Sequence, residues 1–118
     1  MIAVDTNIVV RFLTHDDAGQ YQKAYTLFDK HDVFIADSVM LETEWVLRFA
    51  YNFDAQRIAN ALAQLLGLPN VHVNHPSLLA QAIAWHSQVL NFADAFHLAS
   101  SQQCKTFFTF DKKMVKAA

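Results

Sequence analysis

Four carboxylates of the sequence stand where predicted secondary-structure elements begin or end. Asp5 follows a short apolar run at the N-terminus, and Asp111 follows the segment 106–110, which is rich in aromatic and β-branched residues. Glu42 lies near the start of a predicted helix, and Asp94 lies in the first turn of a later one. Because the carboxyl ends of parallel strands meet at one edge of a sheet, we expect Asp5, Glu42 and Asp111 at or near that edge. The sequence leaves open whether Asp94 reaches the same height.

Carboxylates gathered in an apolar setting require a compensating cation. Like charges and burial both disfavour the ionised forms, so such a cluster is costly unless a positive charge occupies it. Hard oxygen ligands without cysteine suit Mg²⁺ or Mn²⁺ better than Zn²⁺. A cation held by carboxylates and water suits phosphodiester hydrolysis, because it lowers the pKa of the bound water and neutralises charge on the phosphate. The acids therefore predict a Mg²⁺- or Mn²⁺-dependent hydrolase of phosphodiesters.

Each of these acids also has a purely structural interpretation. Asp5, Asp94 and Asp111 are each placed to cap a following helix, which is a common role of aspartate. Glu42 stands two positions from Glu44, and its structural interpretation is a solvated helix face. Side chains with this spacing point to different sides of a helix. At most one of the two glutamates is therefore expected to face a site. Capping alone explains poorly why carboxylates recur at strand ends along one edge.

Short apolar segments alternate with helical patterns along the chain, in the order β-α-α-β-α-α-β-α-α-β-α. The predicted strands are 2–4, 33–36, 71–73 and 106–110. The predicted helices are a short one after Asp5, one that opens at Asp16 and Asp17, 39–50, one capped by Asp54 and ended by Gly67, 76–90 and 93–103, and Asp111 is placed to begin a further one. Strands that alternate with helices favour an α/β fold, with a parallel sheet covered on both faces.

Composition excludes several classes of protein. The chain has 118 residues, of which 53% are hydrophobic and 17% charged, so it is expected to form one folded domain rather than a disordered segment. The single Cys104 excludes an internal disulfide framework and fits a reducing, cytoplasmic location. No apolar run reaches the ~18 residues of a membrane helix, and the N-terminus does not resemble a signal peptide.

The net charge of −2 disfavours a simple basic nucleic-acid binder. With the four acids assigned to a metal site, seven acids stand against nine bases in the rest of the chain. The composition therefore permits RNA binding, and it indicates that such binding depends on the metal.

Four segments occur in an order and spacing that together resemble a known family: 4–7 (Val-Asp-Thr-Asn), 41–48 (Leu-Glu-Thr-Glu-Trp-Val-Leu-Arg), 92–99 (Phe-Ala-Asp-Ala-Phe-His-Leu-Ala) and 109–111 (Thr-Phe-Asp). The set resembles the PIN-domain nucleases, specifically the VapC-type toxins of prokaryotic toxin–antitoxin modules. The resemblance spans nearly the whole chain. It implies a single domain over 1–118, built as a three-layer sandwich with a small central parallel sheet flanked by helices.

The resemblance also implies an activity and partners. It implies an endoribonuclease in which a water activated by Mg²⁺ or Mn²⁺ attacks the RNA phosphate, with no covalent nucleophile. It implies a homodimer that a cognate antitoxin protein holds inactive. The acidic residues that match the metal-binding and catalytic quartet of the family are Asp5, Glu42, Asp94 and Asp111. Glu44 matches no ligand.

The chain departs from the family pattern in two places. Relatives often carry a further acid three residues before the third acid of the quartet, and this position is Asn91 here. An uncharged amide there predicts that a second metal binds weakly or only with substrate. The chain also stops soon after Asp111, so a final helix or edge strand is expected to be missing.

A further group of residues is expected to contact substrate or support the metal ligands, and each has a structural alternative. Asn7 matches a polar residue near the metal. Arg11 and Arg48 follow the first and second segments and are candidates for contacts with phosphates, and a surface ion pair is an equal alternative for either arginine. His97 follows Asp94 by three positions, and its alternative is a hydrogen-bonded role within the helix. The lysines at the C-terminal end form a candidate RNA-facing patch or a solvated end. The group comprises Thr6, Asn7, Arg11, Arg48, Asn91, His97 and Lys112.

Two other functions remain open from the sequence. One is a catalytically inactive PIN-like module that acts through protein or RNA contacts; Asn91 and the short C-terminus favour it, and the four acids oppose it. The other is a phosphatase or receiver-like domain, which also places acids at strand ends. A receiver domain shows paired acids after its first strand, whereas this chain shows only Asp5 there.

Overall fold

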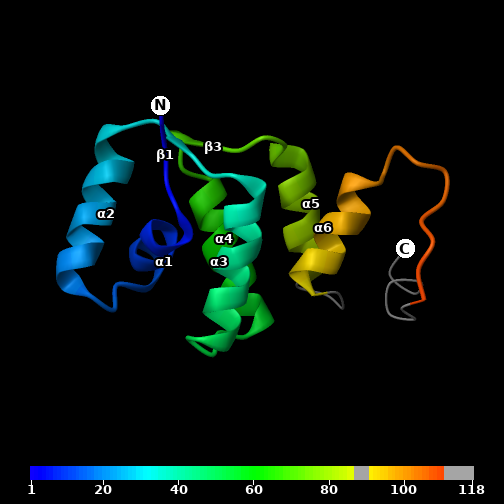
Figure 1. Cartoon of the computed structure of the whole chain (residues 1–118), viewed down its shortest axis with the longest axis horizontal. Coiled ribbons are helices and arrows are strands. Elements are labelled where there is room, and N and C mark those ends of the chain that lie inside the picture. The colour runs from blue at the N-terminus through cyan, green and yellow to red at the C-terminus, as the bar shows by residue number, and fades with distance from the viewer. Residues whose placement is uncertain (87–90, 111–118) are drawn as a thin grey trace. The chain divides into compact units, whose positions relative to one another are not determined.

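The computed structural model describes residues 1–86 and 91–110 of the chain. The chain divides into two compact units, Met1–Asn74 and His75–Ala118. The first unit contains a three-stranded sheet and four helices, and the second contains two helices among its described residues (Figure 1).

The three strands of the first unit are short and parallel. They are β1 (Ile2–Ala3), β2 (Val33–Phe34) and β3 (Val71–His72), and they lie in the order β1-β2-β3. The backbone N–H of Ile35 donates to the carbonyl of His72 at 2.9 Å, so the pairing of β2 with β3 continues beyond the ladder. Helical crossovers separate consecutive strands, which is the connection that parallel pairing requires. The predicted parallel sheet is confirmed, although each strand is shorter than predicted.

Six helices surround or follow these strands in the described residues, and they pack in local pairs. Helix α1 packs against α2 and α3, α3 packs against α4, and in the second unit α5 packs against α6 (Figure 1). None of them is long and apolar enough to span a membrane. The helices are α1 (Thr6–Thr14), α2 (Ala18–Lys30), α3 (Asp37–Phe49), α4 (Ala55–Leu66), α5 (Pro76–His86) and α6 (Phe92–Ser100).

Aspartates begin several of these helices, as the sequence predicts. The Asp17 carboxylate accepts from the N–H of Gln20 at 3.0 Å, at the start of α2. The Asp54 carboxylate accepts from the N–H of Arg57 at 2.8 Å, at the start of α4. Gly67 closes α4, where its N–H donates to carbonyls of the last turn. Each cap satisfies a backbone group that the helix itself leaves unpaired.

The apolar faces of the helices and strands form the core of the first unit. These side chains are almost completely buried, which is the main stabilising contribution to a domain of this size. The most buried of them are Val9, Val33, Ile35, Met40, Leu47, Ile58, Leu62 and Leu65. In the second unit, Leu79 and Ala82 of α5 and Phe92 and Ala95 of α6 are buried in the same way.

The prediction of a fourth strand at 106–110 is wrong. This segment has no regular secondary structure, and the side chains of Phe108 and Phe110 are exposed. Aromatic and β-branched residues favour a strand only where a neighbouring strand offers backbone partners and packing, and the sheet of the described residues has three members. The last predicted helix, 93–103, is also shorter than predicted and ends at Ser100. The end of the predicted helix 76–90 lies outside the described residues.

Replacement of the α4 cap should lower stability without changing the core. We expect Asp54→Ala to reduce the free energy of unfolding by about 0.5–2 kcal/mol, because the N–H of Arg57 loses its acceptor. Asp54→Asn is the matched control, since asparagine caps a helix about as well as aspartate. Urea unfolding followed by circular dichroism measures both values. Equal stability of Asp54→Ala and the wild type would contradict this assignment of the cap.

Candidate metal centre

An open pocket with a volume of about 360 Å³ lies where β1 passes into α1. One wall is a single face of α3, because Val39, Glu42 and Val46 follow one another at positions i, i+3 and i+7. The other wall is the chain that leaves the carboxyl end of β1. The pocket is lined by Asp5, Thr6, Asn7, Val39, Glu42 and Val46.

Asp5 caps α1 from the edge of this pocket. Its Oδ1 atom accepts from the N–H of Ile8 at 3.1 Å, so the structural interpretation of this residue as a helix cap is correct. The side chain is nevertheless exposed and lines the pocket. A carboxylate offers about four lone-pair sites, so one capping bond leaves acceptor capacity for a cation. Asp5 can therefore serve both the helix and a metal.

Glu42 is held in place by Thr6, a residue 36 positions earlier in the chain. The hydroxyl of Thr6 donates a hydrogen bond to Oε1 of Glu42. Thr6 is 8% exposed, whereas Glu42 is exposed to the pocket. The bond joins the first residue of α1 to α3, so it ties the helix that Asp5 caps to the helix that carries Glu42.

Glu44 points away from the pocket, as the spacing of the two glutamates predicts. Its side chain is buried and its Oε2 atom lies 3.0 Å from Nε of Arg48, one turn later on α3. The guanidinium of Arg48 also lies 4.7 Å from the centroid of the Phe49 ring. Arg48 therefore neutralises a buried acid and packs on an aromatic ring. The proposed contact of Arg48 with a phosphate stays a prediction.

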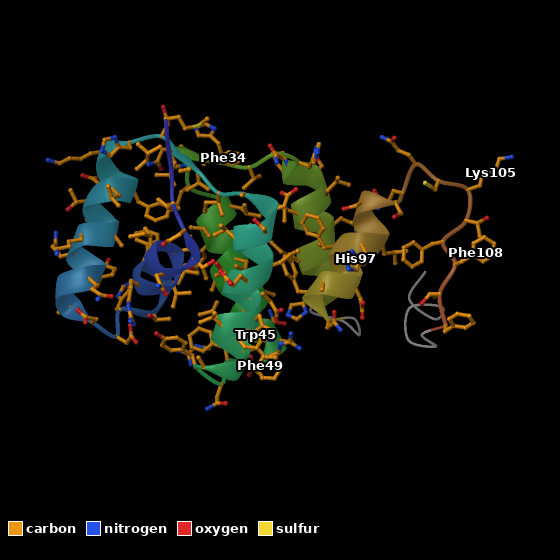
Figure 2. All side chains as sticks on the ribbon, viewed as in Figure 1. Phe34, Trp45, Phe49, His97, Lys105 and Phe108 are labelled. Atoms are coloured by element: carbon orange, nitrogen blue, oxygen red, sulfur yellow. The ribbon has the colours of Figure 1, made fainter. Side chains whose placement is uncertain are left out.

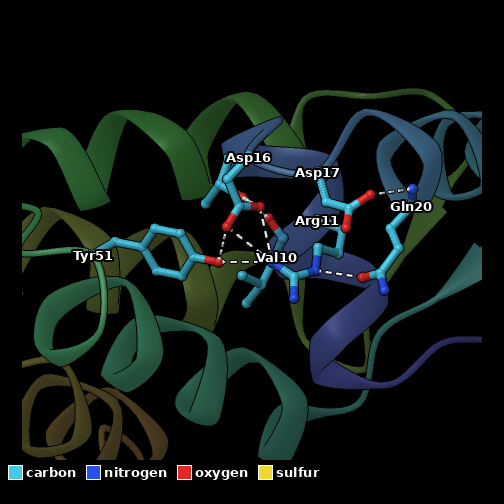
Figure 3. A network of polar contacts seen from close by, with 7 residues as sticks. Val10, Arg11, Asp16, Asp17, Gln20 and Tyr51 are labelled. Atoms are coloured by element: carbon cyan, nitrogen blue, oxygen red, sulfur yellow. Dashed lines mark hydrogen bonds and ion pairs between the residues drawn. The ribbon is translucent and has the colours of Figure 1, made fainter.

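Arg11 lies outside the pocket lining and belongs to a separate polar network that ties together α1, α2 and the loop after α3. Its Nη1 atom lies 2.9 Å from Oδ1 of Asp16 and donates to the hydroxyl oxygen of Tyr51 at 3.0 Å (Figure 3). Its Nε atom donates to Gln20 at 2.6 Å. The Tyr51 hydroxyl in turn donates to Asp16 at 2.7 Å. The interpretation of Arg11 as a surface ion pair is the one that these contacts support.

This network lowers the pKa of the Asp16 carboxyl from its ordinary value of 3.8 to about 2. The hydrogen bond from Tyr51 is the largest favourable cause, and hydrogen bonds from Arg11 and Thr14 add to it, because each stabilises the ionised form. The contact with Asp16 raises the pKa values of Arg11 and Tyr51.

In the second unit, Asp94 lies in the first turn of α6 and is half-buried. It does not cap this helix. Asn91 is the cap, and its Oδ1 atom accepts from the N–H of Asp94 at 2.9 Å. His97 lies one turn after Asp94 with its side chain exposed, and Figure 2 shows it on α6. No hydrogen bond to the His97 ring occurs within residues 1–86 and 91–110, so the predicted bonded role is not observed there.

The structure thus brings four of the predicted site residues into one pocket: Asp5, Thr6, Asn7 and Glu42. Asp94, Asn91 and His97 belong to the other unit, and Asp111 and Lys112 lie outside the described residues. Among the residues that the structure describes, no group of three or more His, Cys, Asp and Glu side chains is arranged to hold a metal.

The donors of the pocket fit Mg²⁺ or Mn²⁺. Asp5, Glu42 and Asn7 offer hard oxygen atoms, and cysteine and histidine are missing from the lining. Mg²⁺ is commonly bound through one or two carboxylates and keeps several of its waters. An open, exposed pocket with two carboxylates meets that requirement.

Comparison with known proteins agrees with the fold and with this donor set. The family model of the PIN domain matches residues 2–118. The chain therefore belongs to the PIN domain family. PIN domains are typically Mg²⁺- or Mn²⁺-dependent nucleases that act on RNA or other nucleic acid, and their fold is an α/β sandwich with a small parallel sheet. No match was found among curated proteins or among solved structures.

Two features of the first unit were missed from the sequence. Val39 and Val46 form the apolar part of the pocket wall, and their spacing around Glu42 on one helix face was a usable signal. The hydrogen bond between Asp16 and Tyr51 joins residues 35 positions apart, and no local sequence pattern predicts it.

Removal of the Tyr51 hydroxyl should raise the pKa of Asp16. Because the folded-state pKa is lowered, the ionised carboxylate stabilises the fold fully above 3.8, and this contribution is lost as the pH falls toward about 2. In Tyr51→Phe the pKa of Asp16 should move back toward 3.8, and the loss of stability over this pH range should shrink. NMR titration of Asp16, together with urea unfolding across the same range, measures both effects.

Tyr25→Phe is the matched control, because Tyr25 is an exposed tyrosine of α2 outside the network. The Asp16 pKa should stay at about 2 in this variant. An unchanged Asp16 pKa in Tyr51→Phe would show that the hydrogen bond from Tyr51 is not the cause of the shift.

Proposed function

We propose that this PIN domain is a metal-dependent endoribonuclease that hydrolyses RNA phosphodiester bonds with a metal-activated water, and that it is the toxin of a type II toxin–antitoxin module. One observation carries the nuclease part of the proposal. Asp5, Asn7 and Glu42 line a single open pocket at the end of a strand, in a chain that matches a family of metal-dependent nucleases.

Asp5 and Glu42 are the metal ligands that the pocket offers. Asp94 and Asp111 are assigned as further ligands and catalytic residues from their match to the acidic quartet of VapC-type toxins. When bound, a divalent cation supplies a Lewis acid that lowers the pKa of a water and neutralises charge on the phosphate.

The residues of the chain orient the reactants around that position. Thr6 holds the carboxylate of Glu42 by its hydrogen bond, and the cap to Ile8 holds the carboxylate of Asp5. Asn7 is exposed in the same pocket, so its amide is available to a phosphate oxygen or a water. Ligands held in this way need little reorganisation when charge develops on the phosphate.

The toxin role rests on the resemblance of the four sequence segments. It implies a cognate antitoxin that blocks the site, a homodimer and action on RNA in the cytoplasm. A small neighbouring reading frame with a DNA-binding pattern, if found by inspection of the gene's surroundings, would support this role. Co-expression of that neighbour should then abolish cleavage by the purified complex.

A catalytically inactive PIN-like module is the second candidate. Asn91 stands where many relatives carry an acid, and its side-chain oxygen is engaged in the cap of α6. Within the described residues, two carboxylates share the pocket. An inactive module would bind RNA or a protein without cutting RNA under any metal condition.

Loss of one carboxylate charge from the pocket should abolish cleavage. Asp5→Asn keeps the helix cap, because asparagine caps as well as aspartate, but removes the charge that holds the cation. We expect cleavage of defined RNAs in Mn²⁺ to fall roughly a hundredfold or more, since a metal contributes several kcal/mol of transition-state stabilisation. Gel analysis of single-turnover cleavage measures the rate.

Asp17→Asn is the matched control, because Asp17 caps α2 with the same geometry and lies outside the pocket lining. This variant should cut RNA at the wild-type rate. Equal cutting by Asp5→Asn and the wild type would remove the catalytic assignment. Binding of RNA without cutting by the wild type, whatever the metal, would favour the inactive module.

Loss of the Thr6 hydroxyl should weaken metal binding without removing a ligand. Thr6→Val keeps the volume of the side chain but leaves Glu42 without its donor, so the affinity for Mn²⁺ should fall about 10–100-fold. Thr6→Ser retains the hydroxyl and should bind Mn²⁺ nearly as well as the wild type. Titration of free Mn²⁺ by electron paramagnetic resonance gives the affinities. Identical Mn²⁺ binding by Thr6→Val and the wild type would contradict the positioning role.

A further inference from the structure

Two large aromatic side chains of α3 are exposed side by side. Trp45 is 55% exposed and Phe49 is 58% exposed. Their ring centroids lie 5.1 Å apart with an interplanar angle of 49°. Figure 2 shows both at the end of α3 that is remote from the sheet. Scattered apolar residues on a surface need no explanation, but a contacting pair of exposed rings on a small domain requires one.

The aromatic pair continues the wall of the metal pocket along the same helix. Glu42, Trp45, Val46 and Phe49 occupy positions i, i+3, i+4 and i+7 of α3, which is one face of a helix. Glu42 and Val46 line the pocket. With a rise of 1.5 Å per residue, Trp45 lies about 4.5 Å and Phe49 about 10.5 Å from Glu42 along the helix axis. A linear ligand that is bound at Glu42 and extends along α3 therefore contacts the two rings next.

Phe49 is held in position by charged residues beneath it. The guanidinium of Arg48 lies 4.7 Å from the centroid of its ring, and Glu44 fixes Arg48 by an ion pair of 3.0 Å. Glu44 itself is buried. The ring therefore packs on a cation whose ion-pair partner is buried. This contact restricts the Phe49 side chain before a partner binds, so binding costs less conformational entropy.

We infer that Trp45 and Phe49 form a stacking platform for bases of single-stranded RNA, next to the bond that is cleaved in the pocket. This inference rests on the proposed function and names the form of its substrate. Exposed aromatic rings beside a cation are the surfaces on which proteins stack unpaired bases, at about 1–3 kcal/mol per base. Bases inside a duplex are stacked on each other, so the platform selects unpaired segments.

The area of the patch favours RNA over a protein partner. Two half-exposed aromatic side chains offer on the order of 250 Å². A stable protein interface buries roughly 800 Å² on each partner. Two rings suffice for one or two bases, whereas a second copy of the chain would need a much larger apolar surface.

The test measures binding of the full-length chain to an unstructured RNA oligonucleotide in Ca²⁺, which fits a site of oxygen ligands but activates its bound water less than Mn²⁺ does, so that cleavage is slow. Trp45→Ala and Phe49→Ala should each weaken binding about 5–150-fold, which corresponds to the loss of one stacked base. Trp45→Phe should restore most of the affinity, because it keeps a ring. Tyr25→Ala removes an exposed aromatic residue of α2 and should bind as the wild type.

A spectroscopic measurement separates stacking from an indirect effect. The chain has two tryptophans, so Trp85→Phe leaves Trp45 as the reporter. Oligonucleotide addition should quench the fluorescence of Trp45 in this variant, and the circular dichroism of Trp45→Ala should match that of the wild type. Unchanged RNA affinity in both alanine variants, or no binding of RNA by the wild type, would overturn the platform.

The outcomes separate this inference from the proposed function. If Asp5→Asn stops cleavage but the alanine variants bind RNA normally, the nuclease stands and the platform is wrong. If the alanine variants lose RNA but the wild type never cuts, the platform stands and the nuclease is wrong. A change in oligomeric state of Trp45→Ala by sedimentation, with unchanged RNA affinity, would assign the patch to a protein contact and overturn the platform.

Discussion

The hydrogen bond from Thr6 to Glu42 is the contact on which the candidate metal centre depends. Each strand of the sheet spans two residues in the ladder, so the sheet alone restrains the position of the chain that follows it only weakly. The bond reaches from the first residue of α1 to the middle of α3 and is largely shielded from water at Thr6. It joins the helix that begins at Asp5 to the helix that carries the second carboxylate. The pocket is therefore a product of helix contacts more than of the sheet.

The far end of α1 is fixed by a different kind of contact. There His15 adopts a left-handed conformation with φ of 58°, and the chain turns toward α2. Asp16 in this turn is bound by Arg11 and by Tyr51, which follows α3. Helix α1 is thus tied to α3 near both of its ends, once through a shielded hydroxyl and once through an exposed ionic network.

The parts of the structure that were predictable are those that local sequence determines. Asp54 was identified as a cap because capping depends on atoms three residues away. The approach of Glu42 to the end of β1 followed from the alternation of strands and helices, which restricts the sheet to parallel pairing. The segment 106–110 was misassigned, because a strand depends on a partner far away in the sequence.

The double use of Asp5 has a consequence for how this position can vary among related chains. A side chain there must accept a hydrogen bond from the start of α1 and, under the proposed function, must also carry negative charge into the pocket. Asparagine, serine and threonine meet the first demand only. Glutamate meets the second demand, but its longer side chain is not among the preferred caps. Aspartate alone meets both demands. Replacement by asparagine, serine or threonine would keep the cap of α1 but remove the charge from the pocket, so an intact α1 would not indicate an active enzyme.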